Sequence, residues 1–107
     1  MTQQDHVARS LALHQLVAAR LRAQPELLDI VRSNLRHWRS RADRSQDRYI
    51  SAWEHILAQG LDATLGALAD SSDLGTTLRQ ASPFAGVLTP RERSAFLREW
   101  EATHAQK

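Results

Sequence analysis

The segment 82–93 limits most strongly what this chain can fold into, because it first interrupts and then restarts helical structure. A proline and a glycine in its first half prevent a continuous helix. Thr89 and Glu92 have the spacing of a capping box, in which each side chain bonds the other residue's backbone amide, and Pro90 occupies the first helical position. A well-marked final helix is therefore predicted to begin at this point.

The bend before this capping box carries one aromatic residue, Phe84. We expect Phe84 or Val87 to pack inward. Capping accounts for the polar groups that follow, so Phe84, Arg91 and Arg93 are the residues of the segment that remain available to a partner.

Apolar residues elsewhere recur at spacings of three and four, which is typical of amphipathic helices. These patterns cover residues 4–23, 27–38, 49–57, 61–69, 74–81 and 95–100. Gly60 should end one helix in the left-handed conformation, and residues 40–47 indicate an exposed loop or frayed helix end. No β-hairpin signal is present. The sequence predicts an all-α fold, a compact single-domain bundle of five to six short helices spanning residues 1–107.

Composition narrows the class of protein further. A chain of 107 residues with 42% hydrophobic and 24% charged residues is typical of one globular domain. It contains no cysteine, which excludes disulfides and thiol catalysis. We expect no membrane segment, and a cytoplasmic location, because no apolar run approaches membrane-spanning length and the first residues lack a secretory leader pattern.

Catalytic and metal-binding patterns are also missing from the sequence. The five histidines include no pair at i and i+4, the serines lack a nucleophile-elbow pattern, and the four glycines occur singly rather than in a phosphate-binding loop. We therefore expect no metal, no cofactor and no enzymatic activity. His14 falls in the apolar arc of the first helix, where we interpret it as a core or boundary residue.

An arginine-rich segment offers a possible nucleic-acid interface through Arg32, Arg36, Arg39, Arg41, Arg44 and Arg48. Two alternatives remain open: a solvated helix face paired with local acids, or a surface that meets acidic groups of a partner or of the chain's own residues 49–78. That last segment carries four acidic and no basic residues. The short helix predicted after Gly60 therefore makes a poor DNA-recognition helix.

Three tryptophans, Trp38, Trp53 and Trp100, lie in apolar stripes, and core packing is the default interpretation for each. A tryptophan that so small a fold covers incompletely would instead mark a binding surface. Trp100 and Phe84 are the candidates, since both belong to the C-terminal part and can form one apolar patch.

The chain resembles a loose group of small, all-helical bacterial proteins that are similar to the antitoxins of toxin-antitoxin pairs. The residues that carry the resemblance are Leu13-His14, Pro25-Glu26-Leu27-Leu28, Asn34-Leu35-Arg36-His37-Trp38, Trp53 with Ile56-Leu57, Leu78-Arg79-Gln80 and the segment from Ser82 to Arg93. The resemblance implies a protein that neutralises a toxin by binding it, often with a second role in repressing its own operon. Antitoxins commonly bind through a disordered tail, whereas helical patterning here runs almost to the C-terminus, so a folded face is expected to make the contact.

Overall fold

A computed structural model describes residues 2–41 and 44–104, and all regular structure in these two ranges is helical. The α-helices are α1 (Gln3–Ala23), α2 (Leu28–Arg41), α3 (Asp47–Ala58), α4 (Leu61–Ala69), α5 (Asp73–Gln80) and α6 (Pro90–His104), and two short 3-10 helices are η1 (Pro25–Leu27) and η2 (Arg44–Gln46). The all-α prediction is confirmed. None of the described helices is long and apolar enough to span a membrane.

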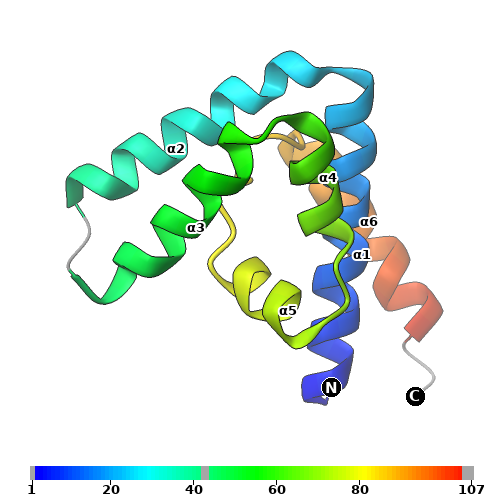
Figure 1. Cartoon of the computed structure of the whole chain (residues 1–107). Coiled ribbons are helices and arrows are strands. Elements are labelled where there is room, and N and C mark those ends of the chain that lie inside the picture. Colours follow the sequence, from blue (N-terminus) through cyan, green and yellow to red (C-terminus); the bar gives the residue numbers. More distant parts are fainter. Residues whose placement is uncertain (1, 42–43, 105–107) are drawn as a thin grey trace.

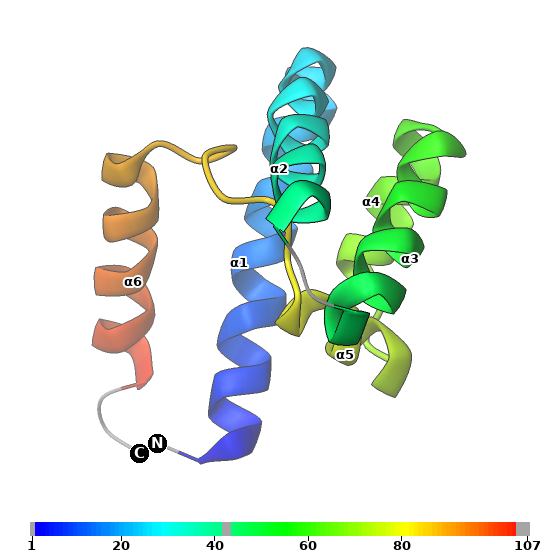
Figure 2. The same cartoon turned by 90° about the vertical axis from the view of Figure 1, so that its left-hand side faces the viewer.

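Helix α1 forms the middle of the molecule (Figure 2), with α3, α4 and α5 on one side and α6, running in the opposite direction, on the other. Helices α2 and α3 form a hairpin that projects from the body (Figure 1). The radius of gyration is 14.1 Å, against about 13 Å for a compact domain of this size. The projecting hairpin and the separate position of α6 account for this extended shape.

Local capping signals place several helix ends. The predicted capping box is confirmed, since the Thr89 amide donates to Glu92 Oε1 at 2.8 Å and the Glu92 amide donates to Thr89 Oγ1 at 3.1 Å. Gly60 follows α3 and has a φ of +108°, which lies in the left-handed region that favours glycine, as predicted, although its ψ of −176° is not that of a left-handed helical residue. Gln59 is the C-cap of α3, and Gly60 directly after it is the N-cap of α4.

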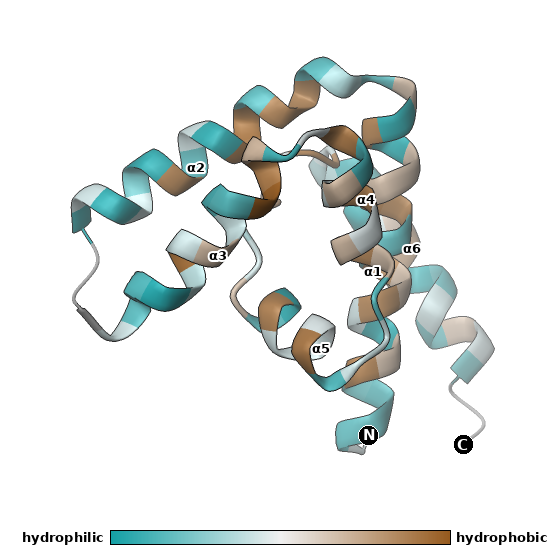
Figure 3. Ribbon diagram, in the orientation of Figure 1, coloured by the Kyte–Doolittle hydropathy of each residue, from teal (hydrophilic) through white to brown (hydrophobic). Residues whose placement is uncertain are grey.

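The predicted loop over residues 40–47 is shorter than expected. Helix α2 continues to Arg41, and η2 begins at Arg44. Residues 42–43 lie outside the described ranges. Figure 3 shows that this outer end of the hairpin is largely hydrophilic, consistent with helices that extend beyond the core.

Trp53 lies at the centre of the core. It is fully buried, and its indole nitrogen donates to the Leu78 carbonyl at 3.1 Å, which joins α3 to α5. The side chains packed in this core include Val17, Leu21, Leu28, Val31, Leu35, Ile50, Leu57, Leu65, Leu68 and Leu78. Truncating a buried tryptophan to alanine typically costs about 3 to 5 kcal/mol, so this residue is a major contributor to the stability of the fold.

The connector, residues 81–89, crosses the molecule and carries the chain from α5 to α6. Phe84 and Val87 are both 4% exposed, so the expectation that one of them packs inward is met by both. The side chain of Asn34 on α2 donates to the Pro83 carbonyl at 2.9 Å and to the Ala85 carbonyl at 2.8 Å. The connector is thus a fixed part of the core.

Candidate functional site

His14 makes the polar contact that joins the connector to α1. Its Nδ1 lies 2.7 Å from the Ser10 carbonyl oxygen and its Nε2 lies 2.7 Å from Ser82 Oγ. Because a carbonyl only accepts, Nδ1 carries the proton and the Ser82 hydroxyl donates to Nε2. Burial lowers the pKa of His14, the Ser10 hydrogen bond opposes that change, and the charges of Arg79 and Arg93 add to it. The imidazole is therefore neutral near pH 7, and its assignment to the core is confirmed.

The pairing of Ser82 with an imidazole is a contact that sequence reasoning missed. A hydroxyl beside a histidine is one part of a nucleophilic site. Here, however, the two hydrogen bonds satisfy both nitrogens of a buried ring, which accounts for the pair structurally. The expectation that the chain is not an enzyme stays a prediction. No three His, Asp or Glu side chains within the described ranges lie close enough together to hold a metal ion.

Phe84 is buried, with 4% of its surface exposed, which corrects its assignment as an exposed partner contact, although its ring forms part of the lining of a cleft beside α1. Its ring meets the edge of Trp53 at 5.1 Å between ring centroids and that of His14 at 6.2 Å. These rings cover it because the connector passes between α1 and α3. The single apolar patch proposed for Phe84 and Trp100 therefore does not form.

A cleft of about 400 Å³ lies between α1, the connector and α6. The lining residues important for its chemistry are Arg9, Leu13, Val17, Leu88, Arg93 and Leu97. His6 also contributes to the wall, and none of the described residues that line the cleft is acidic. The cleft therefore combines apolar walls with positive charge.

Helix α6 is attached to the body mainly at its N-terminus. Glu92, which caps the helix, also forms an ion pair with Arg20 of α1. No described residue of α6 is fully buried, whereas the apolar pattern over residues 95–100 predicts a buried side made by Ala95, Phe96, Leu97 and Trp100. In the structure Ala95 is exposed and the other three are half-buried. The reason is that α6 stands beside α1 across the cleft (Figure 2) instead of packing closely against it.

An aromatic row runs along α6. Phe96 and Trp100 stack with ring centroids 6.1 Å apart, and Trp100 and His104 stack at 3.7 Å. The indole nitrogen of Trp100 is buried and has no hydrogen-bond partner among the described residues. An unpaired buried donor is rare in proteins and unfavourable. Trp100 is thus a half-buried side chain whose indole N–H lacks a hydrogen-bond acceptor among the described residues.

The remaining candidate partner residues, Arg91 and Arg93, are both exposed on α6. Arg93 borders the cleft, together with Leu97 one turn later. The structure therefore brings Arg91, Arg93 and Trp100 onto one helix, while Phe84 on the connector shares with Arg93 the lining of the cleft and does not adjoin Trp100.

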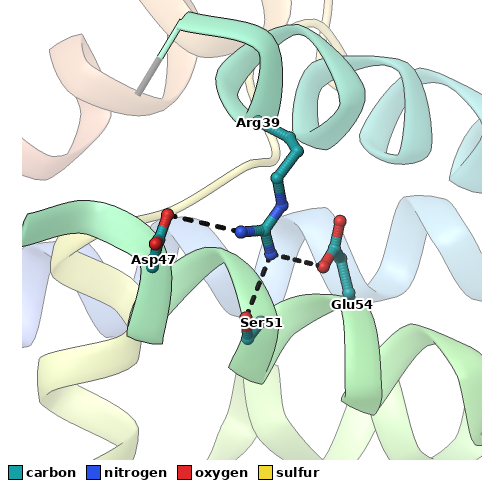
Figure 4. A network of polar contacts seen from close by, with 4 residues as sticks. All are labelled: Arg39, Asp47, Ser51 and Glu54. Carbon is teal, nitrogen blue, oxygen red and sulfur yellow. Dashed lines mark hydrogen bonds and ion pairs between the residues drawn. The ribbon is translucent and has the colours of Figure 1, made fainter. Parts of the chain in front are cut away.

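The candidate nucleic-acid interface is partly neutralised by acids. Arg39 bonds three groups of α3 (Figure 4): Asp47 at 3.3 Å, Ser51 at 3.0 Å and Glu54 at 2.7 Å. These interactions raise its pKa, chiefly through the Glu54 hydrogen bond. For Arg39, the structure thus supports the alternative in which an arginine of this segment pairs with nearby acids and with acids of residues 49–78.

The other arginines of the segment differ in their surroundings. Arg32 pairs with Asp29 at 3.1 Å. Arg36, Arg41 and Arg48 have no carboxylate partner among the described residues; Arg41 approaches His37 and Arg48 lies over the Tyr49 ring. The side chain of Arg44 falls outside the described part of the chain. Three cations on the hairpin thus remain available to an anionic partner.

Searches of protein-family models, curated proteins and solved structures found no match for this chain.

Proposed function

We propose that this chain is a non-enzymatic protein-binding module that acts in the cytoplasm as an antitoxin-like protein, neutralising a partner toxin by direct binding. The observation that carries the proposal is the incomplete cover of α6. This helix has three half-buried apolar side chains, Phe96, Leu97 and Trp100, and no fully buried one. An amphipathic helix normally gains its stability by burying such a face.

A folded face suits the proposal better than a flexible tail. Helix α6 has a complete capping box and an ion pair to α1 at its beginning. Its position is therefore defined before any partner arrives, which lowers the ordering cost of binding. Trp100 is the expected anchor, since tryptophan is enriched at the centres of protein interfaces.

The test is co-expression of this chain with the product of the adjacent gene, read as growth rescue and as a complex in size-exclusion chromatography. We expect both for the unmodified chain, and we expect Trp100→Ala to weaken both while the helical circular dichroism spectrum is unchanged. Absence of both complex and rescue with the unmodified chain would reject the function.

Nucleic-acid binding by a transcriptional regulator remains the second candidate. The observation in its favour is that Arg36, Arg41 and Arg48 on the projecting hairpin lack carboxylate partners among the described residues. Such side chains can contact phosphates without losing an existing ion pair.

A further inference from the structure

The cleft between α1 and α6 has the features of a docking groove for a helix. Its two long walls are antiparallel helices (Figure 2), and Leu13, Val17 and Leu97 place apolar side chains along them. A groove between two helices can bind a third, amphipathic helix, which inserts apolar side chains at spacings of three and four residues. The cleft has a volume of about 400 Å³, which gives room for side chains inserted from such a helix.

Charge determines which kind of helix fits this cleft. The guanidinium of Arg93 has no hydrogen bond or ion pair among the described residues, and that of Arg9 contacts the ring of His6, at 3.5 Å. Both arginines border a wall without acidic residues. A carboxylate placed between them would gain two cationic neighbours, and charge-assisted hydrogen bonds are stronger than those between neutral groups.

A separate observation supports this positive potential. The pKa of the buried His14 at the base of the cleft is lowered first by burial, and the positive charges of Arg79 and Arg93 lower it further. The field inside the cleft therefore already disfavours additional positive charge.

We infer that the α1/α6 cleft binds an amphipathic helix of a partner protein that carries acidic residues beside its apolar face, with Arg9 and Arg93 as the residues that recognise its carboxylates. This inference rests on the proposed function and adds the cleft to its interface, beside the α6 surface that carries Trp100. A basic or neutral helix would leave both arginines without partners, and the cleft would discriminate against it.

The experiment uses two fluorescein-labelled peptides of about 14 residues, enough for two successive anchor turns. Both have leucine at helical spacing; one has glutamate and the other lysine at the flanking positions. Fluorescence anisotropy with the full chain should show that the glutamate peptide binds at least about tenfold more tightly. The double variant Arg9→Glu plus Arg93→Glu should reverse this preference.

The matched control is Arg22→Glu plus Arg98→Glu, which makes the same charge change on the same two helices at exposed positions outside the cleft. We expect this control to keep the preference for the glutamate peptide within about threefold. Equal effects of the two double variants would show a general charge effect and overturn the inference. So would equal binding of the two peptides, failure of the unmodified chain to bind the glutamate peptide, or competition by inorganic phosphate alone.

The same variants separate this inference from the proposed function. If the adjacent gene product forms a complex that survives Arg9→Glu plus Arg93→Glu, the cleft is not its binding site, although the protein-binding function stands. If the unmodified chain forms no such complex but prefers the glutamate peptide, the function fails while the cleft chemistry stands. Self-association that the cleft variant abolishes would identify a second copy as the occupant and overturn the inference.

Discussion

Replacing Phe84 with alanine tests whether the connector belongs to the core or to a binding surface. The side chain is 4% exposed and lies against Trp53 at 5.1 Å between ring centroids. Removing a buried phenylalanine costs about 3 to 5 kcal/mol. A well-oriented aromatic pair accounts for about 0.5 to 1.5 kcal/mol beyond the area it buries. We therefore expect Phe84→Ala to lower the free energy of unfolding by about 4 kcal/mol.

This loss is large compared with the total stability of a small domain, about 5 to 15 kcal/mol. Urea unfolding followed by circular dichroism measures it directly. With a slope of about 1.5 kcal/mol per molar urea, the midpoint should fall by about 2 to 3 M. Phe84→Leu should have a urea midpoint much closer to that of the unmodified chain than Phe84→Ala has, because leucine keeps much of the buried volume.

Trp100→Ala is the matched comparison, since Trp100 was assigned to the same surface as Phe84 but is only half-buried. We expect it to lower the free energy of unfolding by less than Phe84→Ala does, because Trp100 is less buried than Phe84, while it weakens the complex with the adjacent gene product. A small stability loss for Phe84→Ala combined with lost binding would refute this reasoning and return Phe84 to the surface.

Three further substitution experiments follow from the described residues. Gly66→Ala should raise the free energy of unfolding by about 0.5 to 1 kcal/mol, because a Cβ at this position meets no atom within 4 Å. Gly75→Ala should lower the free energy of unfolding by about 1 to 3 kcal/mol, because a Cβ there would overlap the Asp70 carbonyl. Thermal unfolding of the two variants compares these effects. His14 has a lowered pKa in the folded chain, so the unfolded chain binds more protons below pH 6.5. The urea midpoint should therefore fall as the pH drops from about 7 to about 5, and His14→Gln should reduce this slope; an unchanged slope in that variant would contradict the assignment. If the hairpin binds nucleic acid, Arg36→Ala plus Arg41→Ala should weaken salt-dependent binding to duplex DNA in a filter or anisotropy assay, and unchanged affinity would exclude this interface.

The helices were predictable because their signals are local. Capping residues, proline positions and apolar spacing act within a few neighbouring residues, and the box of Thr89 and Glu92 forms as its spacing indicates. The contact of His14 with Ser82 was not predictable, because it joins residues that are 68 positions apart. The position of His14 in an apolar arc indicated only that it would be buried, and no pattern identified its partner.

Helix α6 shows where local signals stop being sufficient. Its apolar stripe correctly predicts a helix, but a stripe does not specify whether the cover comes from the same chain or from a partner. The cover depends on how closely α1 packs against α6, and in this structure a cleft lies between the two helices instead of a close contact. The same arrangement brings Arg9 of α1 and Arg93 of α6 to the two walls of one cleft, although neither position is unusual within its own helix. An incompletely covered helix face of this kind therefore appears in the sequence only as an apolar stripe that the rest of a small fold lacks the residues to cover.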